Sequence, residues 1–430
     1  MHSPLAAEQI ILNLVQPLTA EFDQEWVDLG LAGDRILATA ITSPLDFPYW
    51  DNSAMDGYAV RFADVSQARA EQPVGLEIIE EIPAGYAPQQ TVQVGQAARL
   101  FTGSMLPAGA DTVVMQEQTQ RQGNQVQILA APKLAEFVRP RGAYYQAGSS
   151  LLSAGMRLNA PELAVLATVQ SVQVPVYRRP VVAILSTGSE LIAPDQPLAL
   201  GQIVDSNQYA LAQLAAQTGA EVKLMPRVGD RPDALKLAIQ SALDSADLVL
   251  SSGGVSVGDY DFVDRSLAEL GAEIHIRSVA VRPGKPLTVA TFPPEGVGER
   301  PRLYFGLPGN PVSALVSFWR FVQPALRKLS GLAEGWGPFF VQATTRQPLQ
   351  GDQRREAYFW GQLYLVNGRY EFGLAAGNHS SGNLINLAQT NGLAVVSCAH
   401  EVSPKENRPH VAAGESIQVL QVGMPTLPKM

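Results

Sequence analysis

The sequence predicts a multidomain protein of the α/β plus β class. Its central part alternates apolar strands with amphipathic helices, and short β-rich pieces with many Gly and Pro residues lie on both sides of it. Strands that alternate with helices indicate βαβ units and a parallel sheet covered on both faces, whereas closely spaced short strands indicate a separate β domain. With 430 residues, 46% hydrophobic and 17% charged, the chain has the apolar content for packed cores and is long enough for roughly two to four domains.

The first two expected domains interleave along the chain. A small helical linking domain takes residues 1–45 and 150–178, and a β-rich insertion domain, residues 46–149, separates its two parts. The linking domain has apolar residues at helical spacing, which are Ala7, Ile10, Ile11 and Leu14 near its start and Pro161 to Gln170 near its end. The inserted domain carries short strand patterns at 92–102 and 125–130.

The third expected domain, residues 179–332, is a three-layer α/β domain with a parallel sheet. Its strands are expected at 181–185, 222–228, 248–250, 274–281 and 303–305. Its helices are expected at 208–218, 235–243, 262–270 and from Pro311 onward. Short strands return after Gly335, so residues 333–430 are expected to form a C-terminal β-barrel-like domain.

Charge and cysteine content exclude several function classes. The 31 Lys and Arg residues are outnumbered by 40 Asp and Glu residues, and a net charge of -9 disfavours general binding to nucleic acid or to anionic lipid. The single cysteine, Cys398, excludes an internal disulfide and a Cys-rich zinc site. The first basic residue is Arg35, and no apolar run is long enough to span a bilayer. These features predict a cytoplasmic protein with no membrane or nucleic-acid partner.

Three loops in the α/β domain each follow an expected strand, at 186–190, 251–261 and 306–311. In an open parallel sheet the loops at the carboxyl ends of the strands surround the ligand, so all three are expected to line one crevice. The expected substrate-binding residues in these loops are Ser186, Thr187, Gly188, Ser252, Gly253, Gly254, Ser256, Pro308, Gly309 and Asn310.

Charged groups beside these loops suggest an anion and a metal. Asn310 as a helix cap followed by Pro311 would leave helix N–H groups facing the crevice, although an ordinary strand-to-helix turn has the same sequence. Asp261 beside a phosphate cradle suggests Mg²⁺, and the alternative is a helix-capping role, which we favour for Asp259. Arg282 and Lys285 lie three residues apart across a proline-flanked turn, where fixed cations can hold a small oxyanion.

Five motifs occur in a fixed order, at 51–59, 186–191, 252–258, 283–286 and 307–311. This series resembles the molybdopterin molybdenumtransferase family, MoeA, which is related to the E domain of gephyrin. The resemblance implies an elongated homodimer with an active cleft between subunits. It also implies a reaction in which molybdenum from molybdate is inserted into adenylylated molybdopterin, with release of AMP and a requirement for Mg²⁺.

The resemblance also implies roles for individual residues. The implied catalytic residues are Asp56, Thr102, Glu190, Asp230 and Asp261, of which Glu190, Asp230 and Asp261 surround the metal. The implied molybdate-binding residues are Arg282, Lys285, Pro286, Ser313, one of Arg354 and Arg355, and one of Ser380 and Ser381. Implied partners are a molybdopterin adenylyltransferase that supplies the substrate and the molybdoenzymes that accept the product.

The chain departs from the family pattern at two places. An acidic pair usually follows the Arg-Gly at Arg141, whereas this chain has Ala143, Tyr144 and Tyr145, and Ser189 stands where Asp is common. Two other functions therefore stay open at the level of sequence. One is a molybdopterin adenylyltransferase, and the other is a non-catalytic scaffold that binds a partner peptide through the C-terminal β domain. Molybdenum and tungsten are not distinguished, because their oxyanions have similar shape and charge.

Overall fold

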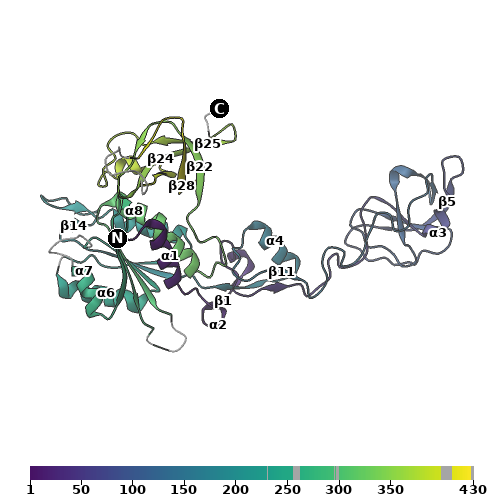
Figure 1. The fold of residues 1–430 in the computed structure, drawn as a ribbon. Coiled ribbons are helices and arrows are strands. Elements are labelled where there is room, and N and C mark those ends of the chain that lie inside the picture. The colour runs from purple at the N-terminus through teal and green to yellow at the C-terminus, as the bar shows by residue number, and fades with distance from the viewer. Residues whose placement is uncertain (230, 255–261, 295, 297–299, 399–408, 428–430) are drawn as a thin grey trace. The chain divides into compact units, whose positions relative to one another are not determined.

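The computed structural model describes residues 1–229, 231–254, 262–294, 296, 300–398 and 409–427 (Figure 1). The chain divides into two compact units. The first unit comprises Met1–Thr39, Ala154–Leu163 and Gln173–Met430, and the second comprises Ala40–Ser153 and Ala164–Val172. The four domain boundaries expected from the sequence stay predictions.

The first unit is built around a six-stranded sheet of order β16-β13-β17-β21-β20-β18. Four neighbouring strands are parallel, namely β16 (Glu221–Leu224), β13 (Val181–Ser186), β17 (Leu248–Ser252) and β21 (Arg302–Leu307). They form from the apolar runs seen in the sequence, and β17 is buried along its whole length. A strand buried on both sides needs apolar residues facing both helix layers, which explains the continuous runs.

Helices cover both faces of this sheet (Figure 1). Val182 and Ile184 of β13 pack with α1 (Pro4–Leu14), α5 (Asn207–Gln217) and α8 (Pro311–Ser317). Ala183 and Leu185 of the same strand pack on the opposite face with α6 (Pro232–Ser245) and α7 (Phe262–Glu269). Alternate residues of one strand therefore enter two cores, and the predicted three-layer α/β arrangement is confirmed.

The last two strands at one side of the sheet depart from the all-parallel arrangement expected from the sequence. β18 (Glu273–Ser278) and β20 (Pro286–Phe292) pair antiparallel, and β20 also pairs antiparallel with β21. Only residues 279–285 connect β18 to β20, and residues 293–301 connect β20 to β21. Parallel neighbours need a crossover of about a dozen residues or more, so connections this short force the chain to turn back.

The helix that begins at Pro311 continues well beyond α8. It passes through a π-helical turn, η3 (Phe318–Val322), into α9 (Gln323–Leu329). Apolar residues of all three segments are buried in the core on this face of the sheet, as the spacing of Leu315, Phe318 and Val322 predicts. Arg320 within the π turn is also buried, and it donates hydrogen bonds to Glu8 at 2.5 Å and to the Tyr358 hydroxyl at 3.0 Å.

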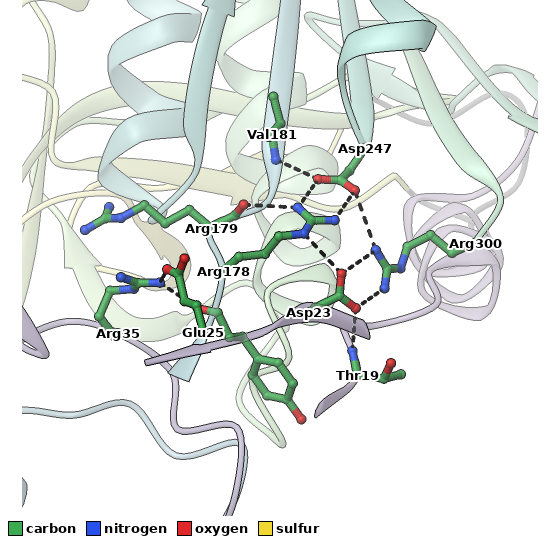
Figure 2. Close-up of polar contacts among 10 residues, drawn as sticks. Thr19, Asp23, Glu25, Arg35, Arg178, Arg179, Val181, Asp247 and Arg300 are labelled. Atoms are coloured by element: carbon green, nitrogen blue, oxygen red, sulfur yellow. Dashed lines mark hydrogen bonds and ion pairs between the residues drawn. The ribbon is translucent and has the colours of Figure 1, made fainter. Parts of the chain in front are cut away.

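A buried ion network joins the start of the chain to the sheet (Figure 2). Asp23, at the end of α2 (Ala20–Asp23), accepts hydrogen bonds from Arg178 and Arg300. Asp247 accepts two hydrogen bonds from Arg178, both at 2.7 Å, and one from the N–H of Val181. Burial raises the pKa of Asp247, but these hydrogen bonds and the arginine charges outweigh it and leave the pKa below its ordinary value.

The C-terminal part of the first unit is a closed barrel. Its strands are β22 (Phe340–Thr345), β24 (Glu356–Val366), β25 (Arg369–Leu374), β26 (Gly392–Val396) and β28 (Ser416–Gln421). They follow the order β24-β25-β22-β28-β26, and the pairing of β26 with β24 closes the ring. The predicted β-barrel-like domain is confirmed. A short strand from the α/β domain, β19 (Val281–Arg282), pairs parallel with the start of β24.

The second unit contains a six-stranded sheet of order β7-β4-β6-β5-β9-β8. Its strands are β4 (Gly57–Val60), β5 (Val74–Ile82), β6 (Gln96–Leu100), β7 (Thr112–Met115), β8 (Thr119–Gln122) and β9 (Gln125–Ile128). The expected strand at 92–102 begins only at Gln96, because Gly95 has a positive φ of 76° and the Gln96 N–H turns back to the Gln93 carbonyl. This unit also contains α3 (Phe62–Val65) and most of α4 (Ala160–Thr168).

The remaining pairs of strands are short. They are β1 (Gln24–Asp28) with β12 (Gln173–Tyr177), β2 (Ile41–Thr42) with β11 (Ser150–Leu152), β3 (Asn52–Ser53) with β10 (Val138–Arg139), β14 (Leu191–Ile192) with β15 (Ile203–Val204), and β23 (Leu349–Gln350) with β27 (His410–Val411). In the described parts of the chain, no helix is both long and apolar enough to cross a membrane.

Candidate functional site

A cavity of about 1010 Å³ opens at the carboxyl ends of the parallel strands, and we call it the strand-end cavity. All three predicted loops contribute to its lining, so the crevice expected from the sequence is present. The predicted lining residues that it contains are Thr187, Gly188, Glu190, Ser252, Gly253, Gly254, Pro286, Pro308, Gly309 and Asn310. Leu384 and Gly382 from the C-terminal segment also reach it. Ser186 is fully buried at the end of β13, and Ser256 lies outside the described residues.

The first two loops touch through their backbones. The N–H of Thr187 donates to the carbonyl of Ser252 at 2.9 Å, which continues the parallel pairing past the ends of the strands. Gly253 has a φ of 94°, and a Cβ there would lie 2.3 Å from the carbonyl oxygen of Thr187. Glycine is therefore required at this position both for its backbone conformation and for the close approach of the two loops.

Asn207, at the start of α5, joins the second and third loops. Its side-chain N–H₂ group donates to the Ser252 hydroxyl at 2.6 Å and to the Gly309 carbonyl at 2.9 Å. Only 8% of Asn207 is exposed, so these two bonds hold the loops together inside the protein. Asn207 was not predicted from the sequence, because its partners lie 45 and 102 positions away along the chain.

Asp205 is a second cavity residue that the sequence analysis missed. It is 2% exposed, and its Oδ1 accepts a hydrogen bond from the N–H of Gln208 at 3.1 Å. Its Oδ2 is buried and has no hydrogen-bond partner within the described residues. A buried carboxylate oxygen without a partner is costly, and its position in the lining makes it available to a bound ligand or cation. Its signal in the sequence is the Asp-Ser-Asn run that leads into the α5 helix.

Glu190 is the one predicted metal ligand that the structure describes. Its carboxylate is exposed at the cavity, beside Gly188, and its carbonyl accepts from the N–H of Ile203 at 2.9 Å. The other two predicted ligands, Asp230 and Asp261, lie outside the described residues. Among the residues that are described, no group of three or more His, Cys, Asp or Glu side chains is placed to hold a metal. Glu190 and Asp205 are the carboxylates of the described cavity lining.

The third loop ends at the α8 helix as its sequence predicts. Asn310 occupies the cap position with an extended backbone and Pro311 begins the helix, although the Asn310 side chain makes no capping hydrogen bond. The next helix N–H, that of Val312, donates to the carbonyl of Ser381 at 3.1 Å. The predicted residue Ser381 thus lies against the third loop, while Ser380 is exposed beside it.

The turn at 282–286 extends from the strand-end cavity to the barrel. Pro286 lines the cavity, and the side chain of Lys285 is exposed next to it. The turn packs on α8, because a Cβ added to Gly284 would lie 3.6 Å from the carbonyl oxygen of Ser313, which is itself buried. Three predicted molybdate residues are therefore neighbours here.

Asp352, at the barrel edge, contacts the three predicted arginines. It accepts a hydrogen bond from the Arg355 side chain at 2.7 Å and one from the Arg354 N–H at 3.0 Å, and Arg282 lies 4.0 Å from it. Burial raises the pKa of Asp352, but the Arg355 and Arg354 hydrogen bonds and the charges of Arg355 and Arg282 leave the pKa below its ordinary value. Asp352 was not predicted from the sequence, although it stands just before the arginine pair.

In the second unit, the structure brings Asp56 and Thr102 together. The Thr102 N–H and its hydroxyl both donate to Asp56 Oδ1, each at 2.7 Å. The Thr102 side-chain and backbone hydrogen bonds lower the pKa of Asp56, since they stabilise its charged form. The two residues predicted for this domain therefore form one preorganised group.

An aromatic cluster occupies the place where the sequence lacks the usual acidic pair. Tyr145 stacks on Phe47 with ring centres 5.3 Å apart, and Tyr144 packs on the same ring at 5.7 Å. The neighbouring Arg141 pairs with Asp46 at 2.7 Å, and its N–H donates to Asp51 at 2.6 Å. Aromatic packing and these two acceptors order the segment without Asp or Glu at 143–145.

Comparisons with known proteins cover almost the whole chain. Models of the MoeA N-terminal region (domain I and II), a probable molybdopterin binding domain and the MoeA C-terminal region (domain IV) match residues 3–169, 183–328 and 342–422. A molybdopterin molybdenumtransferase from Nostoc sp. is 59% identical over 96% of this chain and 92% of its own length. Another from Haemophilus influenzae is 32% identical over 96% of this chain and 98% of its own.

A solved structure gives the same result for the fold. The crystal structure of a molybdopterin biosynthesis MoeA protein from Pyrococcus horikoshii matches with a TM-score of 0.80 at 28% identity. The match covers 98% of this chain and 99% of that one. It includes the segments on both sides of the α/β domain, so the similarity extends well beyond the sheet that holds the strand-end cavity.

Proposed function

This chain belongs to the MoeA family of molybdopterin molybdenumtransferases, and from this premise we propose how its residues carry the reaction. It is a transferase of molybdenum cofactor biosynthesis that inserts molybdenum into molybdopterin. The two other functions left open by the sequence are not favoured, because the matched regions span the domains on both sides of the α/β domain and the matched relatives are named as transferases.

The observation that carries the proposal is the strand-end cavity. Asn310 and Pro311 place the N-terminus of α8 in its lining, and the positive end of a helix dipole favours phosphate oxygens. We assign the adenylylated end of the substrate to the loops at 186–190, 251–254 and 306–311. Asn207 keeps two of these loops at a constant separation, so that the reacting phosphoanhydride bond is held in one position.

Molybdate is assigned to the cations at the turn 282–286 and the barrel edge. Arg282 and Lys285 are exposed, and Arg355 is directed by Asp352. Guanidinium and ammonium groups bind a tetrahedral dianion through charge-assisted hydrogen bonds, and the nearby Ser381 and Ser313 add hydroxyl groups. The carboxylate of Asp352 limits the excess positive charge, which favours release of the oxyanion to the substrate over permanent retention.

Mg²⁺ is the metal we propose for this site. Its usual protein environment is one or two carboxylates together with water and substrate phosphates, and the cavity offers Glu190 and the unpartnered Asp205 Oδ2. When bound, the ion would screen the phosphate charges. Asp230 and Asp261 complete the proposed set. The pair formed by Asp56 and Thr102 is proposed as the contribution of the second unit to the reaction.

The family resemblance also supports proposals about the protein in the cell. We propose a cytoplasmic homodimer that receives its substrate from a molybdopterin adenylyltransferase and passes its product to molybdoenzymes. Sedimentation of the purified chain tests the dimer, and transfer of substrate from the purified adenylyltransferase tests the first partner.

AMP release tests the site. The purified chain is incubated with adenylylated molybdopterin, molybdate and Mg²⁺, and we expect Glu190→Gln and Lys285→Met each to lose most of the AMP release. Glu221→Gln, an exposed carboxylate of the same domain that does not line the strand-end cavity, serves as the control. Unchanged release in both site variants would overturn the site assignment. A separate incubation with molybdopterin and ATP tests the alternative, and consumption of ATP without molybdate would support an adenylyltransferase.

A further inference from the structure

A second, smaller cavity in the first unit is lined by five arginines. It has a volume of about 90 Å³, and its arginines are Arg35, Arg157, Arg178, Arg179 and Arg327. Asp34 is the acidic residue of this lining. We call it the arginine cavity. Such a concentration of positive charge is unusual in a chain whose net charge is -9, and none of these residues lines the strand-end cavity.

Two of the arginines are already neutralised by carboxylates (Figure 2). Arg178 forms hydrogen bonds with Asp247 at 2.7 Å and with Asp23 at 3.1 Å. Arg35 pairs with Glu25 and also donates to the carbonyl of Tyr177 at 2.7 Å. These contacts hold both side chains in place, so they form a fixed wall for the cavity.

The other three arginines are poorly neutralised. Arg157 is 3.6 Å from Asp34, whose side chain is 78% exposed, so solvent screens this pair. Within the described residues, neither Arg179 nor Arg327 has an ion pair. Figure 2 shows the guanidinium of Arg179 directed away from the carboxylates that bind Arg178. Arg327 donates one hydrogen bond, to the Gly337 carbonyl at 3.1 Å.

The electrostatics of Arg327 reflect this crowding. Burial lowers its pKa, and the positive charge of Arg157 lowers the pKa further. Two positive charges that repel each other at a partly buried position destabilise the folded protein unless an anion compensates them.

A structural explanation covers only part of the cluster. The α5 helix ends at Gln217 and the α9 helix ends at Leu329, and cations are favoured at the C-terminal ends of helices. That effect accounts for a cation near each helix end. It does not account for three guanidinium groups around one cavity, where the half-buried Arg327 donates a single hydrogen bond in the described part of the chain and the exposed Arg157 and Arg179 are accessible to a ligand.

We propose that the arginine cavity binds a small inorganic tetrahedral oxyanion of the phosphate class. Its volume of about 90 Å³ is less than a tenth of that of the strand-end cavity, at about 1010 Å³, which favours a small ion over a nucleotide-sized ligand. Arginine forks match the oxygens of a tetrahedral dianion. Molybdate has the same shape and charge as the other members of this class, so free phosphate and molybdate are the two sources to distinguish.

Thermal unfolding of the full chain tests the proposal without any pterin substrate. The probe is inorganic phosphate, compared with sodium chloride at the same ionic strength. We expect phosphate to raise the Tm of the wild type, and we expect Arg327→Gln and Arg157→Gln each to weaken phosphate binding roughly ten- to a hundredfold, the loss expected for one or two charge-assisted hydrogen bonds. Arg369→Gln removes an equal charge from an exposed strand position outside both cavities and should keep the phosphate response.

The Tm of the Arg327 variant, compared with and without phosphate, separates ligand binding from a structural role. If Arg327 serves only to support the fold, its variant lowers the Tm by the same amount with and without phosphate, and the proposal is overturned. A wild-type response no larger than that to chloride also overturns it. Molybdate is titrated in parallel, and tighter binding of molybdate than of phosphate identifies the occupant within the class. AMP binding with the same dependence on Arg327 would contradict an inorganic ion.

Because the experiment uses no substrate and measures no turnover, its failure leaves the proposed molybdenum transfer untouched. Conversely, the loss of AMP release in Glu190→Gln does not bear on the arginine cavity. The two results are therefore distinguishable.

Discussion

Replacing Asn207 by alanine tests whether the strand-end loops are held together by a single side chain. The change removes hydrogen bonds of 2.6 Å to the Ser252 hydroxyl and 2.9 Å to the Gly309 carbonyl, at a position that is 8% exposed. Each buried hydrogen bond contributes about 1 kcal/mol, so we expect the free energy of unfolding to fall by about 2 kcal/mol. For a domain of about 150–250 residues that corresponds to roughly 4–8 °C in Tm.

The activity should fall more than the stability suggests. Loops that no longer hold a constant separation misplace the reacting groups, and a displacement of about 1 Å can reduce turnover roughly a hundredfold. Differential scanning calorimetry measures the first effect, and AMP release under saturating substrate measures the second. We expect kcat to fall at least tenfold, by about 1.4 kcal/mol of barrier or more.

Two further variants sharpen the result. Asn207→Asp keeps the shape but cannot donate to the Gly309 carbonyl, so we expect a loss at least as large as that of alanine. Gln213→Ala changes an exposed residue of the same helix and should leave both quantities unchanged. Wild-type stability and activity in Asn207→Asp would refute the reasoning, because the donated hydrogen bonds would then have no role.

Three other predictions follow from the same structure. Gly253→Ala should lower the free energy of unfolding more than Gly271→Ala does, as measured by denaturant unfolding. Both glycines have a positive φ, but of the two only Gly253 has other atoms within 4 Å of an added Cβ, the nearest being a carbonyl oxygen at 2.3 Å. Equal losses in the two variants would contradict the loop packing. Asp247→Asn should lower the free energy of unfolding by about 1.5–3 kcal/mol, since it removes the carboxylate charge and one of the two oxygens that accept from Arg178, while Asp23 still accepts from Arg178 and Arg300, and calorimetry showing less than about 0.5 kcal/mol would contradict this. The lowered pKa of Asp56 stabilises the folded unit above the ordinary carboxyl pKa of about 3.9, and this contribution is lost as the pH falls through the folded value. Thr102→Val should therefore reduce the pH dependence of Tm between roughly pH 6 and pH 3, and an unaltered profile would refute the coupling.

Much of the candidate site was predictable because its signals are local. The apolar runs that become β13, β17 and β21 are each followed directly by a polar, glycine-rich loop. The general geometry of parallel sheets then places such loops at one edge. The turn at 282–286 was likewise found from adjacent residues alone, as was the start of α8 at Pro311.

The residues that were missed depend on contacts between distant segments. Asn207 stands in the Asp-Ser-Asn run at the start of α5, but its role arises only when Ser252 and Gly309 come within hydrogen-bond distance. Asp352 is significant only because β19 pairs with β24 and thereby brings Arg282 toward Arg355. Five arginines spread from Arg35 to Arg327 reveal no cluster when the sequence is read in order.

The sequence by itself therefore determined the class of fold, the three strand-end loops and the family, since each is encoded in residues that are neighbours along the chain. Tertiary structure decided the antiparallel edge of the central sheet, the closure of the barrel, and the partners of Asn207, Asp205 and Asp352. The physical reason is the separation along the chain of the residues that interact. Local patterns set backbone preferences and burial, whereas hydrogen bonds and charge pairs depend on distances of a few ångströms that only the folded chain creates.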